Sequence, residues 1–314
     1  MDAQSHTASL VTPPSWLQIV GSQMRQRPAT TAALAAGLAA LLLLLLQSIW
    51  QISQHQASDA LRYGFYGGMA GFIATSLGAL PALFLRSIPQ RMEDAMMGFA
   101  AGMMLAASSF SLLLPGLEAA EKITGNGGLA AAIVVSGMAL GVLLMLGLDA
   151  FTPHEHEGSG PCGPGYERCP RVWLFVFAIA LHNLPEGMAI GVSFSQGDMK
   201  VGLPLTSAIA LQDIPEGLAV ALTLCAAGFR PLFAVTVAIA TGFLEPLGAL
   251  LGVGLSSGLA FAYPMGLGLA AGAMLFVVSH EVIPETHRNG HQTFATMGLM
   301  LGFALMMTLD TALG

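Results

Sequence analysis

Nine long apolar stretches constrain this 314-residue chain more than any other feature. A membrane-spanning helix needs about 20 predominantly apolar residues, and each stretch reaches that length. Hydrophobic residues make up 54% of the chain and charged residues only 9%, which excludes an ordinary soluble domain. The sequence therefore predicts an all-α integral membrane protein with nine spans, at residues 31–50, 63–85, 95–117, 127–148, 172–196, 201–229, 231–257, 263–284 and 293–313.

The first stretch differs from the others in what precedes it. Arg25 and Arg27 stand before a leucine-rich run, and a signal peptide begins in the same way. The run 31–50 is longer than a usual signal core, and no clear small-residue cleavage site follows it. We therefore expect a retained peripheral helix at 31–50, separate from an eight-helix domain over 63–314.

Basic residues predict the orientation of the spans, because Lys and Arg concentrate on the cytoplasmic side. With a cytoplasmic N-terminal segment at 1–30, eight of the eleven Lys and Arg fall inside, and only Arg62, Lys122 and Lys200 fall outside. The opposite orientation would reverse this bias. The C-terminus is then expected outside.

An internal repeat relates the second to fourth spans to the seventh to ninth. A shift of 170 residues aligns 98–105 with 268–275 and 77–80 with 247–250, and a shift of 161 aligns glycines, a methionine and an aspartate of the fourth and ninth spans. Biased Gly-Ala-Leu composition is the alternative explanation. Because the copies lie five spans apart, they cross the membrane in opposite directions. This predicts a 3+2+3 inverted arrangement, as in secondary transporters, with units 63–150, 172–229 and 231–314.

Glycines four residues apart recur along these spans, as in Gly98/Gly102 and Gly268/Gly272. Small residues at this spacing let helix backbones approach closely within lipid. The pattern fits packing inside one chain and packing in a homodimer equally well.

Two six-residue motifs thirty residues apart carry the chemistry of the central spans. They read His182-Asn-Leu-Pro-Glu-Gly187 and Gln212-Asp-Ile-Pro-Glu-Gly217. Helix positions three and four residues apart share a face, so His182 and Asn183 project beside Glu186, and Gln212 and Asp213 beside Glu216. Each proline removes one amide and frees a carbonyl, which membrane helices tolerate only beside a cavity or a partner. The motifs predict one metal site built from two kinked helices.

Four carboxylates must be neutralised at the depth of this site. Glu245 in the next span lies at a depth similar to Glu186 and Glu216, with Asp213 beside them, and all Lys and Arg lie at span ends or in loops. Buried carboxylates therefore need protons or cations, and two divalent ions would balance four charges. Imidazole, amide and carboxylate ligands together favour Zn²⁺ over Mg²⁺ or Ca²⁺. A proton-bound polar network is the alternative.

Further candidate ligands flank this site. Met104 lies in the repeat, where a thioether would favour Zn²⁺ or Cd²⁺, although a methionine in such a chain is more often a lipid-facing residue or a core filler. His154 and His156 stand in the inside loop, which could collect exiting metal or be merely a solvated acidic loop. The inner end of the eighth span adds a cluster on the same predicted side, and these residues form a candidate cytoplasmic exit path: His154, His156, His280, Glu281 and His291.

With these motifs, the chain resembles bacterial members of the ZIP (Zrt/Irt-like) family of divalent metal transporters over about 250 residues. The resemblance implies an eight-helix 3+2+3 fold in the bacterial inner membrane, transport of Zn²⁺ and also Cd²⁺ into the cytoplasm, and a two-metal centre. One ion would bind Met104, His182, Glu186, Gln212 and Glu216, with Asp213 nearby. The other would bind Asn183, Glu186, Asp213, Glu216 and Glu245. The first span departs from the family pattern.

Two rival functions remain at this level. An exporter or proton-coupled exchanger could use the same ligands, because sequence does not fix direction. An intramembrane metalloenzyme fits less well, since the chain lacks His-Glu-x-x-His and offers no uncoordinated general base. We expect metal transport by alternating access and no enzyme activity. The expected partners are divalent ions and membrane lipid, with neither an organic cofactor nor nucleic acid.

Overall fold

The computed structural model describes most of the chain after residue 57. The described residues are six isolated positions between 39 and 50, then 58–85, 87–151, 154–156, 160–162, 171–256 and 260–313. The chain divides into two units after Ala40, and the fold below is that of the second unit, residues 41–314. The expected first span, 31–50, lies mostly outside the described residues.

Within the described residues, eight helical segments are long and apolar enough to cross a membrane. The first three comprise α3 (Asp59–Ala79) with the 3₁₀ turn η1 (Leu80–Leu83), α4 (Gln90–Ala106) with the π-helix η2 (Ala107–Leu113) and α5 (Leu114–Thr124), and α6 (Gly127–Phe151). The central pair is α7 (Arg171–Phe194) and α8 (Met199–Ala226). The last three comprise α9 (Pro231–Gly242) with α10 (Leu244–Ser256), α11 (Ala262–Val277) with the π-helix η4 (Val278–Val282) and α12 (Ile283–His287), and α13 (Gln292–Leu313).

Local chemistry explains where several of these helices begin and end. The Ser58 hydroxyl accepts a hydrogen bond from the Leu61 amide at 3.2 Å, and Asp198 accepts one from the Lys200 amide at 2.9 Å, so both cap helix N-termini. Pro231 opens α9 at a position where no amide is needed. Gly125 ends α5 with φ of 62°, a left-handed conformation that suits glycine.

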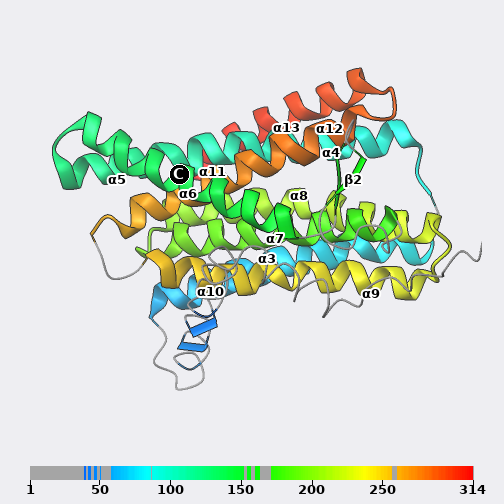
Figure 1. The fold of residues 1–314 in the computed structure, drawn as a ribbon, viewed down its shortest axis with the longest axis horizontal. Helices are drawn as coiled ribbons and strands as arrows, with labels where there is room; N and C mark the ends of the chain where they lie inside the picture. The colour runs from blue at the N-terminus through cyan, green and yellow to red at the C-terminus, as the bar shows by residue number, and fades with distance from the viewer. Residues whose placement is uncertain are drawn as a thin grey trace, which may run out of the picture. The chain divides into compact units, whose positions relative to one another are not determined.

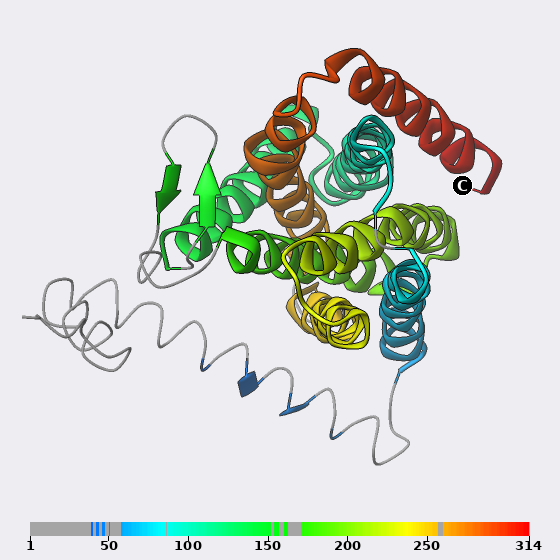
Figure 2. The same cartoon turned by 90° about the vertical axis from the view of Figure 1, so that its right-hand side faces the viewer.

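The two central helices lie between two groups of helices. Figures 1 and 2 both show α7 and α8 with α4, α11 and α13 on one side and α3, α9 and α10 on the other. The closest helix pairs are α4 with α13, α6 with α11, α7 with α10, and α3 with α8. Large apolar side chains such as Leu143 and Leu301 point outward, 62% and 64% exposed, as expected of surfaces that face lipid.

Glycines make the same contacts in both halves of the domain. A Cβ on Gly98 would meet the carbonyl oxygen of Ala295, and a Cβ on Gly268 would meet the carbonyl oxygen of Val134. The two contacts correspond, because Gly268 stands 170 positions after Gly98 and Ala295 stands 161 positions after Val134. The central helices obey the same rule at a shift of 30: Gly217 abuts the Thr75 carbonyl, and Gly187 the Glu245 carbonyl. Backbones therefore approach closely in matched pairs.

Three local features depart from uninterrupted α-helices. The π-helices at Ala107–Leu113 and Val278–Val282 occupy positions that the 170-residue shift superimposes. The span expected over 231–257 is interrupted at Phe243, so α10 begins immediately before Glu245. π-Helical turns and helix breaks inside spans are frequently found near functional sites.

The loop between α6 and α7 contains a short strand pair. β1 (His154–His156) and β2 (Gly160–Cys162) form an antiparallel hairpin, with His154 opposite Cys162 and His156 opposite Gly160. Six residues of this expected solvated loop therefore have regular backbone pairing. Outside this hairpin, the described secondary structure is helical.

Candidate metal centre

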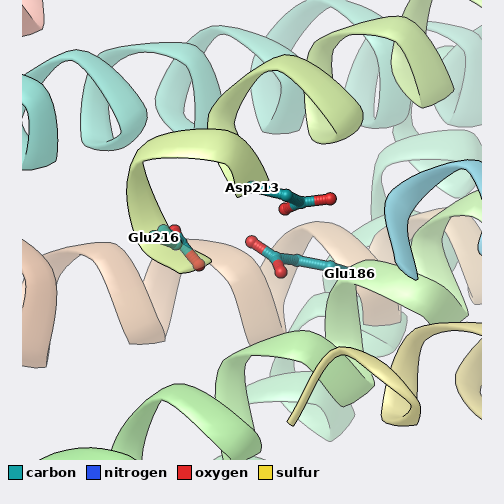
Figure 3. Close-up of side chains that lie close together, drawn as sticks. All are labelled: Glu186, Asp213 and Glu216. Atoms are coloured by element: carbon teal, nitrogen blue, oxygen red, sulfur yellow. The ribbon is translucent and has the colours of Figure 1, made fainter. Parts of the chain in front are cut away.

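Three carboxylates converge in the middle of the domain. Glu186 on α7 meets Asp213 and Glu216 on α8, and one oxygen from each lies within 4.8 Å of the other two (Figure 3). All three are buried, with exposed fractions of 0%, 1% and 1%. The structure thus brings together three of the residues that the motifs predict.

Helix spacing and proline placement explain this convergence. Asp213 and Glu216 are three residues apart on α8 and share one face. α7 and α8 remain helical through Pro185 and Pro215, each of which immediately precedes a glutamate of the cluster. Because α7 and α8 pack against each other, their acidic faces meet.

Gln212 links the two motifs directly. Its side-chain amide donates a 2.7 Å hydrogen bond to Glu186 Oε1, which orients both groups. Glu186 Oε2, Asp213 Oδ2 and both oxygens of Glu216 have no hydrogen-bond partner among the described residues. Gln212 Oε1 is likewise unpartnered and buried. The cluster therefore presents several acceptor atoms that a cation would satisfy.

Glu245 extends the cluster from α10. The Thr75 hydroxyl on α3 donates a 2.8 Å hydrogen bond to Glu245 Oε1, while Oε2 has no partner among the described residues. A Cβ on Gly71 would collide with Glu245 Oε2 and lie 3.1 Å from Asp213 Oδ2. Gly71 therefore leaves the space in which the carboxylates of Glu245 and Asp213 meet.

His182 points from the same helix as Glu186 toward α11 and its extension. Its Nε2 lies 3.2 Å from Glu281 Oε2 in the π-helix η4, and its Nδ1 has no partner among the described residues. Asn183 is 2% exposed and its Nδ2 is unpartnered in the same sense. Met104 on α4 is fully buried in the core cluster that also includes parts of α7 and α8.

The residues of the expected exit path fall into four separate settings. Glu281 contacts His182 and therefore adjoins the centre. His280 is exposed, with its ring 4.8 Å from that of Phe276. His291 Nδ1 lies 2.8 Å from Asp94 Oδ2. His154 and His156 lie on the β1 strand, where only the backbone is described.

The roles of three residues in this region were not predicted from the sequence. Thr75 holds Glu245, Gly71 makes room for it, and Asp94 holds His291 together with the amides of Asn289 and Gln90. One signal for Thr75 was available, because it stands 170 residues before Glu245, at the shift that relates the two repeats. Asp94 gave no comparable signal.

The electrostatics of the centre call for a cation. In the part of the chain that the structure describes, no Lys or Arg side chain is buried. Burying several carboxylates without a countercharge is costly, whereas a metal ion supplies both charge and coordination. Carboxylate, imidazole and amide groups suit first-row divalent ions such as Zn²⁺. The fold and the centre thus define an integral membrane protein with a buried acidic cluster between its central helices.

Comparison with known proteins specifies the family. The model of the family described as "ZIP Zinc transporter" matches residues 154–310. Zinc transporter ZIPB of Bordetella bronchiseptica is 64% identical over 293 residues, covering 93% of this chain and 95% of that protein. Zinc transporter GufA of Myxococcus xanthus is 42% identical over 254 residues (80% and 99%), and human Zinc transporter ZIP11 is 30% identical over 328 residues (76% and 94%).

The chain belongs to the ZIP zinc transporter family. It is therefore a membrane transporter of zinc or related divalent metal ions, and its family consists of transporters rather than enzymes.

Proposed function

We propose that this protein carries Zn²⁺, and also Cd²⁺, into the cytoplasm through the buried cluster on α7, α8 and α10. The observation that carries the proposal is the set of unpartnered, fully buried acceptor atoms on Glu186, Asp213, Glu216 and Glu245. Such atoms are costly within a membrane unless a ligand satisfies them, and ionisable groups at this depth usually line a transport path.

We further propose that the centre holds two ions. Glu186 and Glu216 would bridge both ions. The first ion would use Met104, His182, Glu186, Gln212 and Glu216, and the second Asn183, Glu186, Asp213, Glu216 and Glu245. The support is spatial, because the three-carboxylate cluster is flanked by the His182–Glu281 contact and by the Glu245–Thr75 hydrogen bond.

Metal stoichiometry tests the two-ion part of the proposal. Glu245→Gln removes a charged ligand from the second site alone, so the purified variant should retain one Zn²⁺ where the unmodified protein retains two. Elemental analysis by mass spectrometry after equilibrium dialysis measures this ratio. Two retained ions in the variant, or a single ion in the unmodified protein, would contradict the assignment.

Alternating access of a 3+2+3 inverted arrangement is the proposed mechanism. Its support is the matched glycine contacts at shifts of 170, 161 and 30, together with the paired π-helices. Two halves built alike but pointing in opposite directions can expose one central site to either side of the membrane in turn. We propose that the protein lies in the bacterial inner membrane with its N-terminus and the α12–α13 loop inside, which the distribution of Lys and Arg supports.

The exit toward the cytoplasm would run from His182 to Glu281 and the residues beyond. The 3.2 Å contact between His182 Nε2 and Glu281 Oε2 joins the centre to η4. From there, we propose that His280, His291, His154 and His156 offer further ligands at the predicted inner side.

Metal entry into proteoliposomes tests the function directly. Vesicles loaded with a metal indicator, at equal pH on both sides, should take up Zn²⁺ and Cd²⁺ faster than vesicles without protein. Entry only when a pH gradient is imposed would replace the proposal with proton-coupled exchange. No entry under either condition, from protein that gel filtration shows to be folded, would refute it.

A further inference from the structure

An apolar groove runs between three membrane-spanning helices, next to the turn of α8 that bears part of the metal centre. It has a volume of about 540 Å³ and lies between Met92 and Phe99 on α4, Ile214 and Pro215 on α8, and Met297 and Leu301 on α13. We call it the α4–α8–α13 groove. Ile214 and Pro215 belong to the same turn of α8 as Asp213 and Glu216, so the groove borders the opposite face of that turn.

Helix packing leaves this groove open rather than closing it. α4 and α13 are already in close contact, because a Cβ on Gly298 would meet the carbonyl oxygen of Ala95, and one on Gly302 that of Phe99. Their small residues are thus used within the chain. The edges of the groove instead carry long apolar side chains, and Met92, Met297 and Leu301 are 54%, 60% and 64% exposed.

We propose that the α4–α8–α13 groove binds one acyl chain of an anionic phospholipid. The groove lies within membrane-spanning helices and its lining is apolar, so hydrocarbon is the surrounding medium that can fill it. A second copy of the chain is disfavoured as the occupant of the groove, because helices associate in lipid through small residues and the edges of the groove carry large ones. The flexible methionines at the edges of the groove can adapt to a mobile acyl chain.

The dimensions agree with a single chain from one leaflet. Met92 to Phe99 on α4 and Phe294 to Leu301 on α13 each span seven residues, or ~10 Å along a helix. One leaflet contributes about half of the ~30 Å hydrocarbon core, so the groove accommodates most of one chain's depth. It therefore starts near the membrane surface and ends beside the turn that bears the metal centre.

A positive charge stands at the end of the groove that lies nearest the membrane surface. Arg91 is exposed, immediately precedes Met92 and lies one helical turn before the groove-lining Ala95. The neighbouring acids Glu93 and Asp94 line a different pocket, shared with Glu285. Arg91 can therefore reach a lipid phosphate at the surface, and this charge selects an anionic headgroup.

Native mass spectrometry with phosphatidylglycerol tests the site. Met297→Trp fills the groove, whereas Met300→Trp is a matched control on the same helix, because Met300 is 59% exposed and does not line the groove. We expect the unmodified protein and Met300→Trp to retain one phosphatidylglycerol that Met297→Trp loses. Leu301→Trp provides a second groove variant. Equal retention in the groove variants and the control overturns the proposal, as does loss of a dimer in place of lipid.

The headgroup part of the proposal has its own variant. Arg91→Gln should weaken the preference for phosphatidylglycerol over phosphatidylcholine about fivefold, the effect typical of one basic residue at an anionic surface. The acyl chain should still bind in this variant. An unchanged preference between the two lipids overturns the role of Arg91.

Discussion

At the scale of single residues, the centre depends on groups that hold its ligands as well as on the ligands themselves. Thr75 is 2% exposed and donates its hydroxyl hydrogen to Glu245 Oε1. Partners of this kind fix the orientation of a metal ligand, and their loss typically lowers metal affinity about tenfold to a hundredfold.

Thr75→Val tests this role, because valine keeps the shape of threonine and removes only the hydroxyl. We expect the apparent affinity for Zn²⁺ in proteoliposome uptake to fall about tenfold or more. Thr75→Ser keeps the hydroxyl and should preserve most of that affinity. If valine and serine behave alike, the hydrogen bond does not position Glu245.

The motifs predicted the residues of the cluster but not their supports. Glu186, Asp213 and Glu216 could be found because spacing along a helix and proline placement are local properties of the sequence. Thr75 and Glu281 act across 170 and 99 residues, respectively, and only tertiary packing brings them to Glu245 and His182. Such contacts have no local signature.

At the scale of helices, the position of Glu245 depends on how closely α10 approaches α7. Gly187 and Gly191 abut backbone atoms of Glu245 and Ala249, and Gly248 abuts the Leu184 carbonyl and the Met188 amide in return. This mutual contact leaves no room for a Cβ on either helix.

Gly248→Ala should therefore separate α7 from α10 and destabilise the domain. Overpacking of this kind costs about 1–3 kcal/mol, which corresponds to a fall of ~5 °C in the thermal unfolding midpoint. Gly147→Ala on α6 is the control, because a Cβ there meets nothing within 4 Å. Unfolding followed in detergent solution measures both midpoints. Equal midpoints for the two variants would show that the α7–α10 contact is not tight.

The sequence predicted where the helices lie better than where they deviate. The expected and observed spans agree closely for α6, where 127–148 was expected and Gly127–Phe151 is found. The break at Phe243 and the two π-helices were missed, although a proline follows each of them within two or three residues, at Pro246, Pro115 and Pro284. Because α7 and α8 remain helical through Pro185 and Pro215, a proline alone does not determine where a helix deviates.

At the scale of the whole molecule, the distribution of basic residues predicts an orientation of the chain in the membrane. Glu121 on α5 is exposed next to the α5–α6 turn, which is predicted to lie outside. Thr293 is exposed at the start of α13, which is predicted to lie inside.

Cysteine labelling in intact spheroplasts tests this orientation, with Cys162, Cys169 and Cys225 replaced by serine. A membrane-impermeant maleimide should label Glu121→Cys in intact spheroplasts and Thr293→Cys only after lysis. The reverse pattern would invert the proposed topology.

The internal repeat is also a property of the whole molecule. Thr75 and Glu245 are related by the 170-residue shift and are hydrogen-bonded to each other. Positions that correspond between two related halves can touch only near the axis that relates them. This contact agrees with an axis between the two repeats, but only the structure could identify the touching pair.

The central claim is that metal crosses the membrane through the cluster of Glu186, Asp213 and Glu216. Zn²⁺ uptake by proteoliposomes containing either the unmodified protein or Glu186→Gln tests it most directly, because glutamine keeps the size of the side chain and removes its charge. We expect Glu186→Gln to reduce uptake to that of vesicles without protein, while gel filtration shows the variant to be folded. Uptake by Glu186→Gln at the rate of the unmodified protein would contradict the claim.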